Sequence, residues 1–184
     1  MAPATCGRLS RVTDPSGAVT VLSWDADSRP AGRTLPTGEV ETVTRDACGR
    51  VVRRTVPGAG TWHASYDKCG RLVASSDPVL GRRRFRYDEA GQLVAAIDAM
   101  GGVTRYEYDE AGRAVRIIDP LGAVTHRRFN GRNQAVEVVD PLGRATTAGY
   151  DAAGRQTWQR DPDGHVTAWA YDGAGLQRRV SVDG

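Results

Sequence analysis

Paired carboxylates are the side chains of this chain that come nearest to a metal-binding or acid–base arrangement. Asp161 and Asp163 lie two residues apart, as do Asp25 and Asp27. Carboxylate oxygens at such short spacing suit Ca²⁺, but neither pair continues into a calcium-binding loop that ends in glutamate. An aspartate that begins a turn also accepts hydrogen bonds from backbone N–H groups without any metal. We therefore expect both pairs to be structural, with calcium binding as the alternative hypothesis.

Histidine and cysteine are the other candidates for chemistry. The histidines are His63, His126 and His165, and the cysteines are Cys6, Cys48 and Cys69. No two histidines are close in sequence, whereas a zinc site needs clustered His and Cys ligands. The chain also has no nucleophile-elbow serine and no glycine-rich phosphate loop. We expect no catalytic residue, no cofactor, no metal site and no enzymatic activity.

The acidic residues recur at a fixed interval. An aromatic residue followed by Asp or Asn occurs every 21 residues, at Tyr66, Tyr87, Tyr108, Phe129, Tyr150 and Tyr171. The repeat signature comprises Tyr66, Asp67, Gly70, Arg71, Tyr87, Asp88, Gly91, Tyr108, Asp109, Gly112, Arg113, Asp119, Pro120, Gly122, Asp140, Pro141, Gly143, Tyr150, Asp151, Gly154, Arg155, Asp161, Pro162, Gly164, Tyr171 and Asp172. Carboxylates that return in every repeat are better explained by folding than by one catalytic centre.

Each repeat contains two turn motifs, Tyr-Asp-x-x-Gly and Asp-Pro-x-Gly. Asp begins each turn, Pro has its φ already set, and Gly supplies the position with positive φ. The runs between the turns, such as 113–118 and 123–129, have the length of strands, and Pro and Gly recur too often for a long helix. The sequence therefore predicts an all-β fold of about 17 strands. It is an antiparallel meander of serial 21-residue hairpin repeats that forms a curved, solenoid-like strip.

The unbroken register predicts one repeat region, residues 1–184, with about eight repeats and no separate effector domain. The run before each aromatic marker alternates, which places Tyr106 and Tyr108 on one face. The other run has Val115 and Ile117 on one face but also Ile118 on the opposite face, so its sidedness is weaker. The aromatic row is expected to act as cross-strand partners, and stacking against sugars is the alternative.

The cysteines and the arginines have plain structural interpretations. Cys48 and Cys69 would lie two strands apart, roughly 9.6 Å, which exceeds the ~7 Å limit for disulfide Cα atoms, so we expect free thiols. The net charge is +3, with Lys68 the single lysine. The densest basic cluster runs through Arg82, Arg83, Arg84, Phe85 and Arg86. We expect solvated arginines that pair with nearby carboxylates, with nucleic-acid binding as the less favoured alternative.

The pattern Y-D-x-x-G-R-(L/V)-x-x-x-x-D-P-x-G-x-V-T resembles the YD repeat of bacterial Rhs-type proteins. Tyr108–Thr125 and Tyr150–Thr167 are the best matches. The resemblance weakens at Trp24–Thr44, where Ser28 and Leu35 replace Gly and Asp, and again at Arg45–Ala64. The resemblance implies a structural scaffold, a segment of a β-shell that encapsulates or displays a toxin in proteins of interbacterial competition. A cell-surface carbohydrate-binding or adhesion module is the alternative.

The same resemblance implies the partners and the location. The expected partners are further Rhs repeats or a longer shell chain and an encapsulated C-terminal toxin, because eight repeats are too few to close a shell. Carbohydrate is an alternative partner, and nucleic acid is not expected. The family is secreted or displayed at the cell surface. No stretch has the apolar length of a signal peptide or of a membrane span.

Overall fold

The computed structural model describes the backbone of residues 8–182 and the side chains of residues 8–177. The chain divides into two units, unit 1 up to Phe85 and unit 2 from Arg86, and the division falls within strand β8. None of the described residues forms a helix. Accordingly, nothing in the described part of the chain is a helix that could cross a membrane.

The described residues form seventeen strands, in agreement with the number that the repeat predicts. Unit 1 contains β1 (Arg11–Thr13), β2 (Val19–Trp24), β3 (Pro30–Thr34), β4 (Val40–Arg45), β5 (Val51–Val56), β6 (Gly60–Tyr66), β7 (Leu72–Asp77) and most of β8 (Gly81–Tyr87). Unit 2 contains β9 (Leu93–Ile97), β10 (Val103–Tyr108), β11 (Ala114–Ile118), β12 (Val124–Phe129), β13 (Ala135–Val139), β14 (Ala145–Tyr150), β15 (Gln156–Arg160), β16 (Val166–Tyr171) and β17 (Gln177–Val182).

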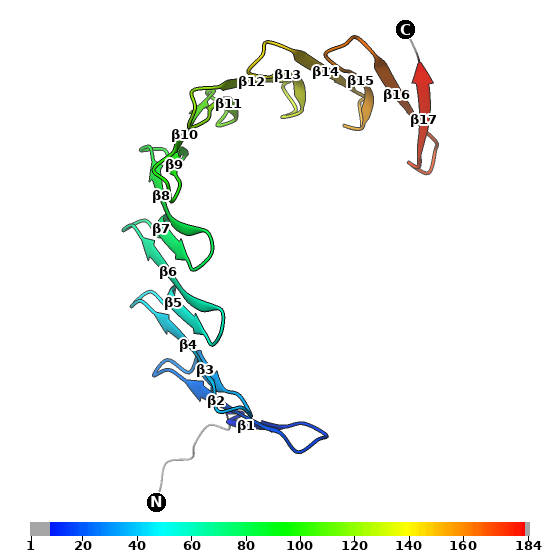
Figure 1. Ribbon diagram of the computed structural model, residues 1–184. Helices are drawn as coiled ribbons and strands as arrows, with labels where there is room; N and C mark the ends of the chain where they lie inside the picture. The colour runs from blue at the N-terminus through cyan, green and yellow to red at the C-terminus, as the bar shows by residue number, and fades with distance from the viewer. Residues whose placement is uncertain (1–7, 183–184) are drawn as a thin grey trace, which may run out of the picture. The chain divides into compact units, whose positions relative to one another are not determined.

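Strands that follow one another in the sequence pair antiparallel. This holds from β1 to β8 in unit 1 and from β9 to β17 in unit 2. Figure 1 shows the hairpins in chain order, and within unit 2 they follow a curved path from β9 to β17. The predicted meander is therefore confirmed in each unit, and its curvature is visible in unit 2.

The two turns of a repeat share one backbone geometry, although their sequences differ. Asp109 donates its N–H to the carbonyl of Arg113 at 3.0 Å, and Gly112 donates to the carbonyl of Asp109 at 2.9 Å. Asp119 makes the same two contacts with Ala123 and Gly122, at 2.9 and 3.0 Å. Gly112 and Gly122 have φ values of 76° and 86°, which glycine adopts without the steric cost of a Cβ atom. This geometry explains why Asp and Gly recur three residues apart.

In the turns that begin with aspartate, the side chain of that residue also binds the backbone of the turn. Oδ1 of Asp109 accepts hydrogen bonds from the N–H groups of Ala111 and Arg113, at 3.0 and 2.9 Å. Oδ1 of Asp119 accepts from Leu121 and Ala123, at 2.9 and 2.8 Å. These acceptors satisfy backbone donors that no strand partner reaches, which is the reason for aspartate at this position.

The segment where the signature weakens still folds as the same turns. Ser28 occupies the glycine position with a φ of 68°, and the bond from its N–H to the carbonyl of Asp25 is retained at 3.1 Å. Leu35 replaces Asp, but its N–H still donates to the carbonyl of Glu39 at 2.8 Å. The turn at Leu35 lacks only the side-chain acceptor. The backbone register thus continues through residues whose side chains no longer match the repeat.

A β-bulge explains the weak sidedness of the first run in each repeat. Tyr106 lies opposite Ile117, whereas Tyr108 lies opposite Ala114, with a register shift between the two pairs. Val115 is the additional residue, and no residue of β10 lies opposite it. The bulge thus interrupts the regular pairing of this run with β10.

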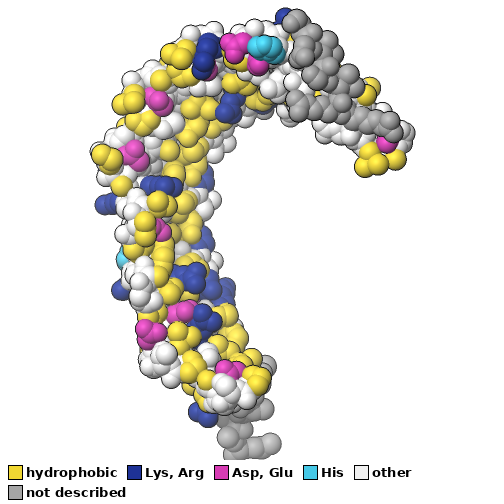
Figure 2. Space-filling model, turned by 45° about the vertical axis from the view of Figure 1, so that its right-hand side comes forward, with side chains coloured by type: hydrophobic (Ala, Val, Ile, Leu, Met, Phe, Trp, Pro, Cys, Tyr) yellow, Lys and Arg dark blue, Asp and Glu magenta, His cyan; other side chains and the backbone are white. Residues whose placement is uncertain are grey.

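The sheet has almost no interior. Among the described residues only Ala95 and Ile97 are buried hydrophobic side chains, with 9% and 8% of their surface exposed. Figure 2 shows hydrophobic side chains interspersed with basic ones over the visible surface. Stability must therefore come from contacts between neighbouring strands, as expected for a repeat protein.

We expect Gly143→Ala to destabilise the protein by about 1–2 kcal/mol, because Gly143 has a φ of 79° and an added Cβ would meet no other atom within 4 Å. Only the backbone conformation would then be penalised. Gly131→Ala is the matched control, since Gly131 lies in a turn with equally free surroundings but without positive φ. Urea unfolding followed by circular dichroism measures both variants, and an equal loss in the two would contradict the turn argument.

Candidate functional site

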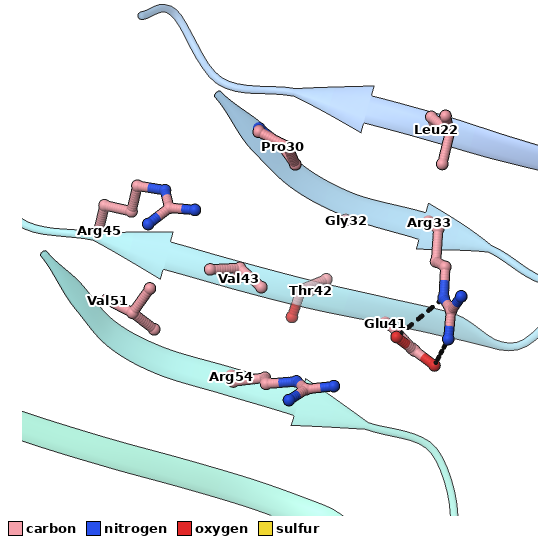
Figure 3. Close-up of a pocket in the computed structure, with 10 residues that line it drawn as sticks. All are labelled: Leu22, Pro30, Gly32, Arg33, Glu41, Thr42, Val43, Arg45, Val51 and Arg54. Atoms are coloured by element: carbon pink, nitrogen blue, oxygen red, sulfur yellow. Dashed lines mark hydrogen bonds and ion pairs between the residues drawn. The ribbon is translucent and has the colours of Figure 1, made fainter. Parts of the chain in front are cut away.

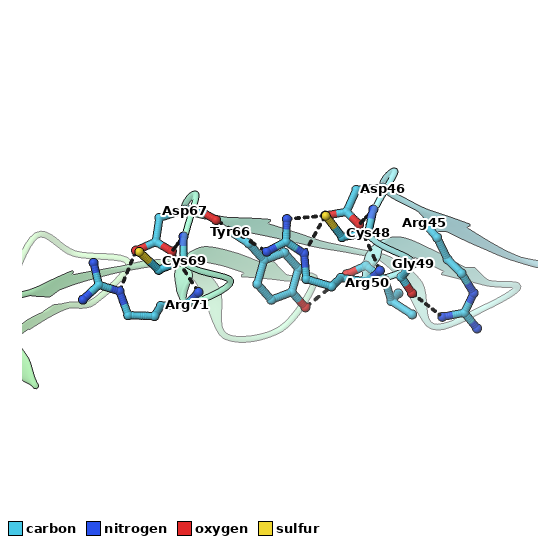
Figure 4. A network of polar contacts seen from close by, with 10 residues as sticks. Arg45, Asp46, Cys48, Gly49, Arg50, Tyr66, Asp67, Cys69 and Arg71 are labelled. Atoms are coloured by element: carbon cyan, nitrogen blue, oxygen red, sulfur yellow. Dashed lines mark hydrogen bonds and ion pairs between the residues drawn. The ribbon is translucent and has the colours of Figure 1, made fainter. Parts of the chain in front are cut away.

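The side chains that could take part in chemistry are joined in a contact network that repeats along the sheet. In unit 1 its members are Asp46, Arg50, Tyr66 and Asp67 (Figure 4). Nε of Arg50 donates to Oδ2 of Asp46 at 2.7 Å, and its Nη2 lies 2.7 Å from the same oxygen. The guanidinium lies over the ring of Tyr66, 4.7 Å from the centroid, and Nη1 donates to the carbonyl of Asp67 at 3.4 Å. One arginine therefore connects its own turn to the next repeat.

Unit 2 builds the same arrangement from equivalent residues. Nε of Arg113 donates to Asp109 at 2.7 Å, and its guanidinium lies 5.3 Å from the ring centroid of Phe129. Arg155 donates to Asp151 at 2.7 Å and lies 4.4 Å from the centroid of Tyr171. A planar guanidinium can stack on a ring and donate in its own plane at the same time. We call this set of contacts the cross-repeat network.

The tyrosine hydroxyl completes the network in the opposite direction along the chain. Tyr108 donates to the carbonyl of Leu93 at 2.9 Å, Tyr150 to that of Ala135 at 2.9 Å, and Tyr171 to that of Gln156 at 2.7 Å. Each acceptor lies fifteen residues before its tyrosine, in the preceding repeat. The aromatic ring is thus held to the preceding repeat both by its hydroxyl and, where the arginine stacks, by a cation–π contact.

The turn carboxylates are kept ionised by their surroundings. The hydrogen bond from Arg113 lowers the pKa of Asp109, and the backbone N–H groups of the turn lower it further. For Asp67 and Asp151 the bond from a backbone N–H is the largest cause of a lowered pKa, and the arginine adds to it. A carboxylate held in this way is a poor general acid near neutral pH, because its proton is already lost, and a weak general base, because its pKa is low.

The network is altered in the repeat that begins at Trp24. Arg45 stands where other repeats have an aromatic ring, and its Nη1 donates to the carbonyl of Gly49 at 3.3 Å. Its Nε lies 3.9 Å from Oδ2 of Asp25, too far for a hydrogen bond. In the complete network the equivalent arginine pairs with the aspartate that begins the turn. Here the guanidinium of Arg29 pairs with Asp27 in place of Asp25, and its Nη1 lies 3.4 Å from Oδ2 of Asp27. Both carboxylates of this acidic pair therefore form ion pairs with arginines, Asp25 with Arg45 and Asp27 with Arg29.

The second acidic pair is brought together with a histidine that we had treated as isolated. Ligand atoms of Asp161, Asp163 and His165 all lie within 4.8 Å of one another. Oδ1 of Asp161 already accepts hydrogen bonds from the N–H groups of the other two residues, at 3.0 and 2.9 Å. The alternation of the three residues across one tight turn was the signal that could have revealed this grouping. Three largely exposed groups, one of them engaged in the turn, do not make a metal centre.

Cys48 and Cys69 lie in equivalent turns of successive repeats and are exposed, free cysteines (Figure 4). This agrees with the thiols expected from the strand spacing. Cys6 lies outside the described residues.

The arginine cluster differs from our expectation of paired charges. Arg82 and Arg84, opposite Ser76 and Ala74, are without an ion pair among the described residues. Such pairs do form elsewhere, for example between Arg128 and Glu137 at 2.9 Å. The difference arises because the strand opposite the cluster supplies serine and alanine in place of glutamate.

The family comparison matches the same repeats. The RHS Repeat family profile matches residues 7–40, 66–99, 87–124, 129–157 and 150–184, which together make up most of the chain. No curated protein matches the chain in sequence.

Solved structures of toxin complexes share the fold. The crystal structure of TcdB2-TccC3 superposes with a TM-score of 0.68 at 15% identity, over 95% of this chain and 11% of that one. The Tc holotoxin pore of Photorhabdus luminescens, with a mutated TccC3, gives a TM-score of 0.67 at 14% identity, over 88% and 10% of the two chains. The chain thus spans about a tenth of the length of these relatives. At such identity the likeness concerns the fold alone.

We expect Arg113→Ala to lower the free energy of unfolding by about 0.5–1 kcal/mol or more, since it removes the stacking on Phe129 and the donors to Asp109 and Asn130. Arg105→Ala is the control, because Arg105 is exposed on the neighbouring strand β10 and makes no such contacts. Chemical unfolding of both variants measures the difference. Equal stability of the two would show that the network contributes nothing.

Acid should unfold the protein. The pKa values of Asp46, Asp67, Asp109 and Asp151 are lower in the folded state than in an unfolded chain. Their contribution is therefore complete above pH ~5 and is lost as the pH falls below ~4 and through the lowered values. Thermal unfolding between pH 2 and 7 should show a falling midpoint below pH ~4, and Asp109→Asn should flatten the curve. A midpoint independent of pH down to 2 would contradict the assignment.

Proposed function

The chain belongs to the RHS-repeat family, and on that premise we propose that it is a segment of a β-shell that encloses or displays a toxin. The observation that carries this proposal is the cross-repeat network. Where it is complete, it ties one repeat to the next with the aspartates, arginines and aromatic residues that an enzyme would use for chemistry. The result is a thin wall built to extend along its repeat axis.

The lack of an interior supports a wall over an independent globular module. A sheet with only two buried side chains among the described residues cannot by itself enclose a cargo protein. Joined to further sheet, the same surface becomes one side of an enclosure. The chain spans about a tenth of the toxin-complex chains that share its fold, which leaves ample length for such an enclosure in a protein of that kind.

A row of exposed apolar side chains along one edge of unit 2 supports a docking partner. Met100, Leu121 and Leu142 occupy the same position in the equivalent turns of three successive repeats and are 97%, 94% and 76% exposed. Turn tips of soluble proteins are commonly polar, and apolar rows that stay exposed mark interaction sites. We infer that further shell, from the same or a longer chain, covers this row, which we call the apolar edge.

The proposed shell role also implies the absence of catalysis, the partners and the location that the family resemblance predicts. The shell segment carries out no catalysis, and its partners are further RHS repeats and the enclosed toxin. The protein acts outside the producing cell or at its surface, in competition between bacteria. These statements follow from the shell role and share its test.

Binding of carbohydrate is the weaker candidate. Sugar stacking requires an accessible ring face. The guanidinium groups of Arg50 and Arg155 lie over the rings of Tyr66 and Tyr171. Because the arginines compete for these faces, no observation favours the sugar hypothesis.

The shell role predicts association. Co-expression with the repeat-containing or toxin-like products encoded beside its gene should yield a complex, seen by light scattering or native mass spectrometry. We expect Leu121→Asp with Leu142→Asp to weaken that complex at least tenfold, because charges would replace the apolar edge. Ala111→Asp with Ala153→Asp is the control, since both alanines hold the third position of the other, geometrically equivalent turn. A chain that remains alone with every such product would refute the proposal.

A further inference from the structure

The altered segment of unit 1 contains a pocket whose lining residues lie between Leu22 and Arg54. It has a volume of about 370 Å³ and lies across strands β2 to β5 (Figure 3). Pro30, Val43 and Val51 form its apolar floor, and Arg33, Arg45 and Arg54 stand around it. This size falls in the lower range of pockets that hold small organic ligands.

The pocket exists because the side chains of this segment depart from the repeat. Arg45 replaces the aromatic ring that fills the corresponding space elsewhere. Val43 lies opposite Arg54, and Arg45 lies opposite Val51, so these four side chains share one face of the sheet. In unit 2, the equivalent of Arg54 is Ile117, which lies opposite Tyr106. The apolar pair of Tyr106 and Ile117 in unit 2 thus corresponds in unit 1 to Val43 and Arg54, where guanidinium groups border a pocket.

One end of the pocket carries an excess of positive charge. Arg33 binds Glu41 through two parallel hydrogen bonds, from Nε at 2.9 Å and from Nη2 at 2.8 Å. Glu41 is largely covered, with 16% of its side chain exposed. The hydrogen bonds from Arg33 lower the pKa of Glu41, and the charge of the nearby Arg54 lowers it further. The Arg54 side chain nevertheless makes no hydrogen bond or ion pair with any described residue. Arg33 and Arg54 therefore both lie near the carboxylate of Glu41, and the guanidinium of Arg54 is available to bind another anion.

The other end has an unsatisfied donor. Nε of Arg45 is buried and has no hydrogen-bond partner. Asp25, the nearest carboxylate, is 3.9 Å away. Buried donors in native proteins usually have an acceptor, whereas Nε of Arg45 has only the longer ion-pair contact with Asp25 among the described residues.

We propose that this pocket binds a single carboxylate carried on an apolar body, with the carboxylate at Arg54 and the body over Pro30, Val43 and Val51. The planar guanidinium fork matches a carboxylate, as the pair of Arg33 and Glu41 shows in the same pocket. The apolar floor disfavours fully hydrated anions such as sulfate. None of the side chains that line the pocket is aromatic, so a sugar has no ring to stack on.

Such a carboxylate has two sources. One is a free organic acid, and the other is an acidic side chain among apolar neighbours in a polypeptide inside the shell. Only the second source rests on the proposed shell role; binding at the pocket itself does not.

Calorimetric titration of the whole chain with hexanoate, acetate and 1-hexanol tests the site. We expect hexanoate to bind at least about tenfold more tightly than acetate, because its methylene groups add apolar contact, and 1-hexanol to bind much more weakly than hexanoate. Arg54→Gln should weaken hexanoate binding at least tenfold. Arg53→Gln is the matched control, because the two arginines are adjacent on β5 and point to opposite faces.

The variants remove the same charge from exposed positions, and circular dichroism checks that both are folded. Equal hexanoate affinity in the two variants, or equal affinity for hexanoate and 1-hexanol, would overturn the proposal. So would the lack of any hexanoate binding to the unaltered chain.

The peptide acetyl-Leu-Glu-Leu-amide and its Gln counterpart distinguish the sources. Binding of the Glu peptide that Arg54→Gln abolishes supports a polypeptide carboxylate in the pocket. Binding of hexanoate without binding of either peptide supports a free acid. Because these readouts are separate from complex formation, a failure here leaves the shell role standing, and a failure of the shell role leaves the pocket standing.

Discussion

The hydrogen bonding of the aspartate that begins most of the turns is the constraint on which the rest of this structure depends. Asp109 holds the turn closed with Oδ1 and fixes Arg113 with Oδ2. The fixed arginine then lies over Phe129 of the following repeat and donates to the carbonyl of Asn130. A local turn contact is thus converted into a contact between repeats. Without the carboxylate the arginine would have many rotamers, and its stacking would cost more entropy.

A protein built in this way does not need a deep core. The hydroxyls of Tyr66, Tyr108, Tyr150 and Tyr171 donate to a carbonyl of the preceding repeat. The sheet ladder connects every strand to the next within its unit, as β10 is connected to β9 and β11. Energetics of this kind are local, so a repeat depends on its neighbours more than on distant parts of the chain. This property suits a wall, in which length can vary while the thickness stays constant.

Departures from the repeat are where individual properties arise. Arg45 in place of an aromatic ring opens the pocket beside Arg54, and Ser28 and Leu35 show that the backbone tolerates such changes. The turn geometry requires a residue that adopts positive φ and the backbone hydrogen bonds that close the turn. It does not require the side-chain acceptor, which the turn at Leu35 lacks. Side chains in the strands are free to change because almost none is buried. A regular scaffold can therefore acquire a binding site in one repeat without losing its register.

The sequence by itself determined the strands, the turns and their antiparallel order, because Asp, Pro and Gly act on the backbone within five residues of themselves. It also indicated the row of aromatic markers. It could not show the bulge at Val115, which depends on the register between two strands. Nor could it show that Asp161, Asp163 and His165 converge or that Arg50 reaches Tyr66. The unpaired state of Arg54 and the pocket beside it were likewise decided by tertiary structure, since a side chain's partners come from neighbouring strands whose distance in space the one-dimensional pattern does not contain.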